Sequence, residues 1–339
     1  MNKHVFRLGV LSVLVCLLGF VELRYGSVEI SGSSFWQALL RQAGADDAYR
    51  LIIWEGRMPR MILAIVAGAG LSVSGLLMQT LFRNPMAGPY VLGISSGAGL
   101  GVALMTMGVS ILGIHAIYGW TVALSGVAGA FLIMFVLLMA ASRIADNVTV
   151  LVLGILIGGI SSAFVSLMQY FSPDAELKRF VMWTLGSLET VNASEVSFIV
   201  VVLLTGITAS FFMFPGLNAL LFGENAAKNL GVNTKKIRYL AITLTALMAG
   251  VITAFCGPIG FVGIIVPHIA RMVCKVDDHK ILIPASCLMG AFVLLLADLV
   301  AHVPGSFIVL PLNAITSVFG IPILVWIILK NKQISASFS

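Results

Sequence analysis

The chain has 339 residues, of which 59% are hydrophobic and only 10% are charged, with a net charge of +6 and a mean hydropathy of +1.06. Because soluble domains carry about 25% charged residues, this composition predicts one domain over residues 1–339 that lies almost entirely in a membrane. The basic residues stand at the ends of apolar runs, as membrane topology requires, which argues against nucleic-acid binding. No Gly-x-x-x-x-Gly-Lys-Ser/Thr motif occurs, which excludes ATP binding by a phosphate loop of that kind.

An all-α polytopic membrane protein is expected, because about 20 apolar residues are needed to span a bilayer as a helix. Ten spans are predicted, at 6–23, 59–82, 90–109, 117–140, 148–171, 194–214, 238–256, 258–274, 281–300 and 309–329. The connections at 24–57 and 172–193 are long and polar, and the first has room for a short amphipathic helix around residues 36–42.

The first apolar run follows Lys3 and Arg7 and is similar to a signal peptide. Glu22-Leu23-Arg24-Tyr25 comes next without a small-x-small cleavage pattern, so we expect a retained first helix. With the N-terminus inside, the inner ends of the spans carry more Lys and Arg than the outer ends, which predicts that both termini are cytoplasmic.

Residues 57–101 combine strong hydrophobicity with helix-breaking residues. Arg-Met-Pro-Arg at 57–60 opens a Gly/Ser-rich helix that reaches Gln79, and Arg-Asn-Pro-Met-Ala-Gly-Pro at 83–89 leads into a run rich in Gly and Ser. Broken backbone at membrane depth is tolerated only where it packs on protein or lines a wet path. This pattern therefore predicts a transport protein with a pathway.

The connection at 215–237, called the docking loop below, is polar and charged. Its stretch 223–232 predicts a short helix that ends at Gly231, since glycine readily adopts the backbone of a helix C-terminus. A solvated loop is the plainer alternative, and we favour a helix that docks on a partner.

A third motif, Gly-Pro-Ile-Gly-Phe-Val-Gly at 257–263 followed by Pro267, predicts a kink and close helix packing. His268 and Arg271 are three residues apart and share a helix face. We interpret them as structural polar residues near the inner interface, with a proton-relay or ligand role as the alternative. The four cysteines are far apart and predict no metal site.

Together these motifs, with Asp-His-Lys at 278–280 and Ala-Asp at 297–298, carry a resemblance over residues 5–330. The chain resembles the permease subunit of the bacterial ATP-driven importers for iron chelates, haem and cobalamin, the FecCD/BtuC-like family. The resemblance implies a homodimer in the cytoplasmic (inner) membrane, with ten helices per subunit and a pathway on the dimer axis. It also implies two ATPase subunits and a periplasmic or lipid-anchored substrate-binding protein as partners. This chain is expected to bind no cofactor and to catalyse no reaction.

The resemblance also assigns roles to residues. Gating or pathway roles fall on Asn84, Met86, Asn147, Val148 and Thr149. Contacts with the ATPase fall on Gly223, Glu224, Ala227, Lys228, Leu230 and Gly231. Contacts with the binding protein fall on Arg57, Arg60 and His302. His302 stands where family members often carry Arg, so its charge is expected to depend on pH. The stretch Val309–Asn313 also lacks the acid and the glycine of the family pattern.

Simpler readings of these residues stay open: Arg57 as an interfacial charge, Asn84 as part of an ordinary turn, and Asp298 as a structural residue that faces protein. An ion-coupled secondary transporter would need an acid at the membrane midplane, for which Asp298 is the only candidate. An intramembrane enzyme would need a convergent catalytic set, which the sequence does not suggest. The expected cargo is an iron chelate such as a siderophore or haem, with cobalamin as the alternative.

Overall fold

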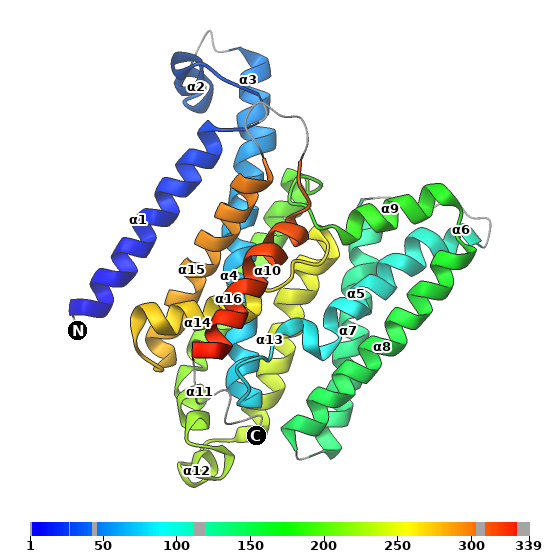
Figure 1. Cartoon of the computed structure of the whole chain (residues 1–339), viewed down its shortest axis with the longest axis vertical. Helices are drawn as coiled ribbons and strands as arrows, with labels where there is room; N and C mark the ends of the chain where they lie inside the picture. The colour runs from blue at the N-terminus through cyan, green and yellow to red at the C-terminus, as the bar shows by residue number, and fades with distance from the viewer. Residues whose placement is uncertain are drawn as a thin grey trace.

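The computed structural model describes residues 2–26, 28–42, 46–111, 119–144, 146–302 and 309–330, and within these ranges the chain is helical apart from loops and one isolated bridge (Figure 1). The elements are α1 Asn2–Arg24, α2 Gly32–Leu39, α3 Asp47–Leu51, η1 Ile52–Arg57, α4 Met58–Phe82, η2 Pro89–Leu92, α5 Ile94–Ala103, η3 Leu104–Gly108, α6 Val109–Ile111, α7 Trp120–Arg143, α8 Asn147–Phe171, α9 Asp174–Thr184, α10 Ala193–Phe212, α11 Phe214–Leu221, α12 Glu224–Asn229, α13 Thr234–Cys256, α14 Val262–Cys274, α15 His279–Ala301 and α16 Leu312–Lys330.

The predicted all-α membrane architecture is confirmed. Eight of the described helices are long and apolar enough to cross a membrane, and two shorter apolar helices lie at Val262–Cys274 and Leu312–Ile327. Each of the ten predicted spans has one of these helices as its counterpart. Helices α2 and α3 lie at one end of the molecule and α12 at the other (Figure 1). These are called the α3 end and the α12 end.

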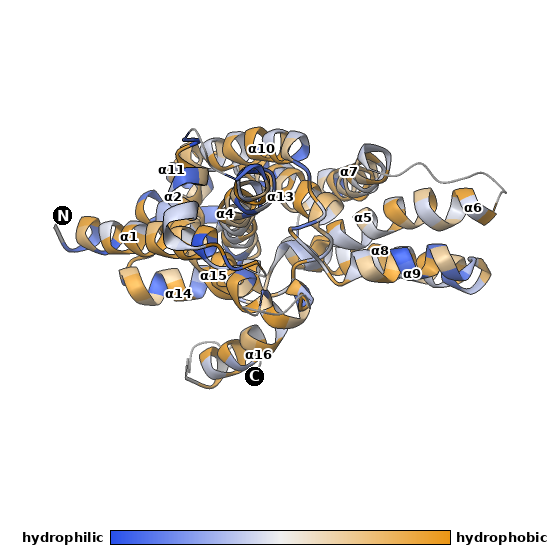
Figure 2. Ribbon diagram, turned by 90° about the horizontal axis from the view of Figure 1, so that it is seen from above, coloured by the Kyte–Doolittle hydropathy of each residue, from blue (hydrophilic) through white to orange (hydrophobic). Residues whose placement is uncertain are grey.

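Helix α4 is the centre of the bundle. It packs on α10, α13, α14 and α15, while α5, α7 and α8 form a lobe to one side (Figures 1 and 2). Small residues allow the close contacts, because glycine lets helix backbones approach without a side chain between them. A Cβ on Gly68 would lie 2.2 Å from the carbonyl oxygen of Gly290, and one on Gly75 would lie 1.6 Å from that of Gly263.

Several helices begin elsewhere than the sequence predicts, and in three of them a proline or glycine lies at the boundary. The second span is one continuous helix over Asp47–Phe82, since a π-helical turn at Ile52–Arg57 joins α3 to α4 just before Pro59. The wide turn accommodates the missing proline N–H. Helix α14 begins at Val262 and not at 258, because Gly257 has φ +73° and Pro258 interrupts the ladder. Helix α16 begins at Leu312, directly after Pro311.

Candidate functional site

The docking loop forms two short helices, α11 and α12, at the α12 end of the molecule (Figure 1). Gly223 has φ +102° and separates the two helices, and Gly231 has φ +79° directly after α12. The predicted short helix that ends at Gly231 is therefore confirmed. Ala227 is fully buried and anchors α12, whereas Leu230 is 67% exposed.

The exposed side of α12 is charged. Lys228 Nζ lies 3.1 Å from Glu224 Oε1, an i,i+4 pair that supports the helix. An exposed leucine beside exposed charges suits a protein partner, which can bury the apolar side chain and meet the charges. The ATPase-docking role of these residues stays a prediction.

The loop at residues 83–93, called the gate loop below, is folded on itself. Arg83 ends α4 with φ +48°, and the side chain of Asn84 accepts a hydrogen bond of 2.9 Å from the N–H of Met86. Asn84 and Met86 are both half-buried. Asn84 therefore fixes the shape of the turn, which agrees with its interpretation as part of an ordinary turn. Its gating role stays a prediction.

Helix α14 holds the gate loop. His268 Nε2 donates to the carbonyl oxygen of Pro85 at 2.8 Å, and Gln79 donates to that of Ile264 at 2.9 Å. Arg271 in turn donates to Gln79 Oε1 at 2.7 Å. These contacts support the interpretation of His268 and Arg271 as structural polar residues.

Residues 146–149, the N-cap and first turn of α8, are called the constriction loop below. Asp146 caps the helix by accepting hydrogen bonds from the N–H and hydroxyl groups of Thr149, at 2.8 and 2.6 Å. These bonds hold the pKa of Asp146 below its usual value. Val148 is 59% exposed, and the side chain of Asn147 lies outside the described residues. Their pathway role stays a prediction.

At the α3 end, five charged or titratable side chains from four segments meet in what we call the ionic cluster: Glu22, Arg60, Glu189, Asp298 and His302. Arg60 lies at its centre, 3.0 Å from Asp298, 3.2 Å from Glu189 and 3.7 Å from Glu22. Asp298 is 2% exposed and paired, so it faces protein at the end of a span, as the structural reading predicted. Arg60 is likewise committed to internal partners.

His302 is held between two acceptors. Its Nε2 lies 2.7 Å from Glu189 Oε1 and its Nδ1 lies 2.8 Å from the carbonyl oxygen of Asp298. Because a carboxylate and a carbonyl only accept, both ring nitrogens must donate, and the imidazole is positively charged. Burial alone lowers the pKa of His302, but the bond to Glu189 and the charge of Asp298 outweigh it and raise the pKa. The same hydrogen bond lowers the pKa of Glu189.

Arg57 is buried, with 4% of its surface exposed. Its guanidinium donates to the carbonyl oxygens of Leu23, at 2.9 Å, Arg24, at 3.1 Å, and Val28. Arg57 therefore holds η1 against the end of α1 and the segment that follows it. Arg57 and Arg60 nevertheless line a hollow of about 370 Å³, and their docking role stays a prediction.

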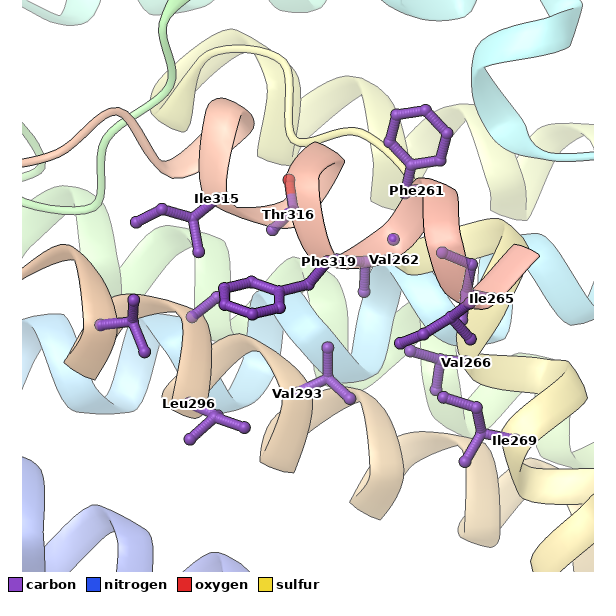
Figure 3. Close-up of a pocket in the computed structure, with 14 residues that line it drawn as sticks. Phe261, Val262, Ile265, Val266, Ile269, Val293, Leu296, Ile315, Thr316 and Phe319 are labelled. Carbon is purple, nitrogen blue, oxygen red and sulfur yellow. The ribbon is translucent and has the colours of Figure 1, made fainter. Parts of the chain in front are cut away.

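Two further hollows differ in chemistry. A cleft of about 540 Å³ along α9 is lined by Lys178, Arg179, Trp183 and Thr190 among others. A cavity of about 250 Å³ between α14, α15 and α16 has walls that are almost entirely apolar, with Phe319 across it and Thr316 as a polar side chain (Figure 3). The α9 cleft combines basic side chains with largely apolar walls, whereas the second cavity suits only apolar groups.

Sequence reasoning missed several residues that the structure brings together. Glu22 and Glu189 belong to the ionic cluster, and Thr80, Asn218 and Arg238 make buried contacts beside the predicted gates. An acid close to the end of a span is a usable signal for Glu22. No local pattern marks the other four, because each acquires its partner only through packing.

Comparison with known proteins agrees with this architecture. Residues 13–330 match the model of the FecCD transport family. The vitamin B12 import system permease proteins BtuC of Salmonella paratyphi A and Salmonella typhimurium are each 36% identical over 283 residues, which is 84% of this chain and 85% of the relative.

Solved structures give the same result. A transporter described as a metal-chelate type ABC transporter, in an inward-facing conformation, superimposes with a TM-score of 0.84 at 29% identity, over 96% of this chain and 99% of that one. PsaBC from Streptococcus pneumoniae, in complex with Fab, shares the fold alone, with a TM-score of 0.55 at 19% identity over 81% of this chain and 92% of that one. The chain therefore belongs to the FecCD transport family and is a BtuC-like multi-pass membrane permease.

Proposed function

We propose that this chain is the membrane subunit of an ATP-driven importer in the bacterial cytoplasmic membrane, and that its cargo is an iron chelate. It works as a homodimer with two ATPase subunits at the α12 end and a substrate-binding protein at the α3 end. Both termini are cytoplasmic in this arrangement. The observation that carries the proposal is the pairing of a projecting, charged helix α12 with a broken backbone at the gate loop, in a chain of this family.

The mechanism follows from this geometry. Binding of ATP to the partner subunits draws the two docking loops together, and the helices rock around the dimer axis. The gate loop and the constriction loop open and close the inner end of the pathway. This chain contributes no covalent chemistry.

The α9 cleft supports an anionic chelate as cargo. Lys178 and Arg179 supply positive charge and Trp183 supplies an aromatic face, a combination that attracts an anionic ligand with flat aromatic groups. Arg179 also pairs with Glu176 at 3.2 Å, which holds it along the helix. Cobalamin is the second candidate, because the BtuC relatives are named as permease proteins of a vitamin B12 import system.

The test is reconstitution with candidate ATPase and binding-protein partners, followed by ATP-dependent uptake of ferric siderophore, haem and cobalamin in parallel. We expect uptake of a ferric siderophore or haem, lost when residues 224–230 are scrambled and the dimer stays folded. Uptake of cobalamin alone would correct the cargo. Uptake without an ATPase, or driven by a proton gradient alone, would contradict the proposal as a whole.

A further inference from the structure

Two buried side chains connect the docking loop to the two loops that are predicted to gate the pathway. His279 connects it to the gate loop and Arg238 connects it to the constriction loop. Neither residue lies in a gate, and neither is exposed for a partner: His279 is 0% exposed and Arg238 is 6% exposed.

The first connection begins in α11. The side chain of Asn218 accepts two hydrogen bonds from His279, one from its backbone N–H at 2.9 Å and one from Nδ1 at 2.8 Å. Its amide nitrogen donates to Asp278 at 2.7 Å, which helps to hold the pKa of that carboxyl below its usual value. The amide of Asn218 therefore ties α11 to the start of α15, in addition to the packing between the two helices.

The same imidazole reaches α4. The hydroxyl of Thr80 lies 2.8 Å from Nε2 of the same ring and 2.9 Å from the carbonyl oxygen of Leu76, so its single proton is shared between these two acceptors when the ring is neutral. Thr80 is in the last turn of α4, and the next turn closes with Asn84 N–H donating to the carbonyl oxygen of Gln79 at 3.2 Å. The ring of His279 therefore connects α11 to the last turn of α4, which leads directly into the gate loop.

The second connection begins at the first residue of α12. The guanidinium of Arg238 lies 3.5 Å from Glu224 Oε2 and donates from its other branch to the carbonyl oxygen of Ile144 at 3.1 Å. Ile144 lies two positions before Asp146, the residue that caps α8. The planar guanidinium group of arginine can hold two partners in fixed directions at once, whereas the ammonium group of lysine cannot.

We propose that His279 and Arg238 are the positioning residues that couple the docking loop to the gates, His279 to the gate loop and Arg238 to the constriction loop. This inference rests on the proposed function, since coupling has meaning only in a complex that hydrolyses ATP. A displacement of α11 and α12 would be passed on through two separate contacts, one at His279 and one at Arg238. We call the contacts of His279 the first connector and those of Arg238 the second connector. Removing one connector should abolish the ATP-dependent movement of its own gate and leave the other gate unaffected.

The experiment uses matched pairs of variants in the reconstituted complex. Thr80→Val cuts the first connector, and Thr245→Val, another buried threonine that bonds a main-chain carbonyl, is its control. Arg238→Lys cuts the second connector, and Arg7→Lys, whose guanidinium also donates to a carbonyl oxygen, is its control. His279→Gln serves as a second variant for the first connector.

Spin labels at Met86→Cys and, separately, Val148→Cys report the distance across the dimer with and without ATP. We expect Thr80→Val and His279→Gln to abolish the ATP-dependent change at residue 86 and keep the change at 148, and Arg238→Lys to do the reverse. Cargo moved per ATP hydrolysed should fall at least fivefold in these variants and stay unchanged in the controls.

The outcomes separate the two proposals. Absence of any ATP-dependent distance change in the unmodified protein would contradict the proposed function. A normal response in that protein, with both changes kept or both lost in every connector variant, would overturn the assignment of one connector to each gate.

Discussion

The charge of His302 makes the α3 end of the molecule sensitive to pH. Raising the pH removes one ring proton, and one of the two hydrogen bonds, to Glu189 or to the carbonyl oxygen of Asp298, must be lost. Folding raises the pKa of His302 above its ordinary value of 6.5. The stabilisation is therefore complete below about 6.5 and is lost as the pH rises through the value in the folded protein.

The size of the effect follows from the contacts. A hydrogen bond to a charged group contributes about 1.5–3 kcal/mol, and His302 is only 4% exposed, so solvent does little to replace the lost bond. The other ionisable side chains that act on the ring are Arg60 and Asp298. Since about 1.4 kcal/mol is a factor of ten, local opening of residues 186–192 should become roughly ten- to a hundredfold more frequent.

Hydrogen exchange of the amides at 186–192, corrected for intrinsic rates, measures this opening in the purified protein. His302→Gln carries no titratable charge at this position and should show the high-pH exchange rates at every pH. The amides of the first turns of α13, at the α12 end of the molecule, serve as the internal reference. Protection that is independent of pH in the unmodified protein, or an unchanged pH dependence in His302→Gln, would refute the reasoning.

Three further predictions concern packing, docking and energy source. Gly75→Ala places a methyl group against the carbonyl oxygen of Gly263 and should lower the free energy of unfolding, measured by thermal unfolding, by more than about 2 kcal/mol. Gly9→Ala, whose methyl group meets open space, should have little effect. Leu230→Asp, at a side chain 67% exposed on the docking loop, should weaken ATPase association about tenfold in a pull-down titration, and unchanged affinity would place the interface elsewhere. Asp298→Asn should retain ATP-driven uptake, while its complete loss together with a requirement for a proton gradient would favour an ion-coupled transporter.

The sequence determined the features that depend on local chemistry. Hydrophobic length located the eight long apolar helices and the two shorter ones, because a helix in lipid needs a run of apolar residues wherever it packs. Glycine and proline predicted the break after α4 and the end of α12 at Gly231, because these residues act on their own backbone. The order of the motifs along the chain was sufficient to predict the family.

The tertiary structure decided which polar groups meet. Arg57, predicted to contact the binding protein or to act as an interfacial charge, is buried against carbonyl oxygens at the end of α1, and the ionic cluster joins side chains from residue 22 to residue 302. Thr80 and His279 are 199 positions apart, and Arg238 and Ile144 are 94 apart. Such pairings depend on how α4, α13 and α15 cross, which small residues at the crossings permit but no local pattern records. The connectors between docking loop and gates could therefore be found only in the folded protein.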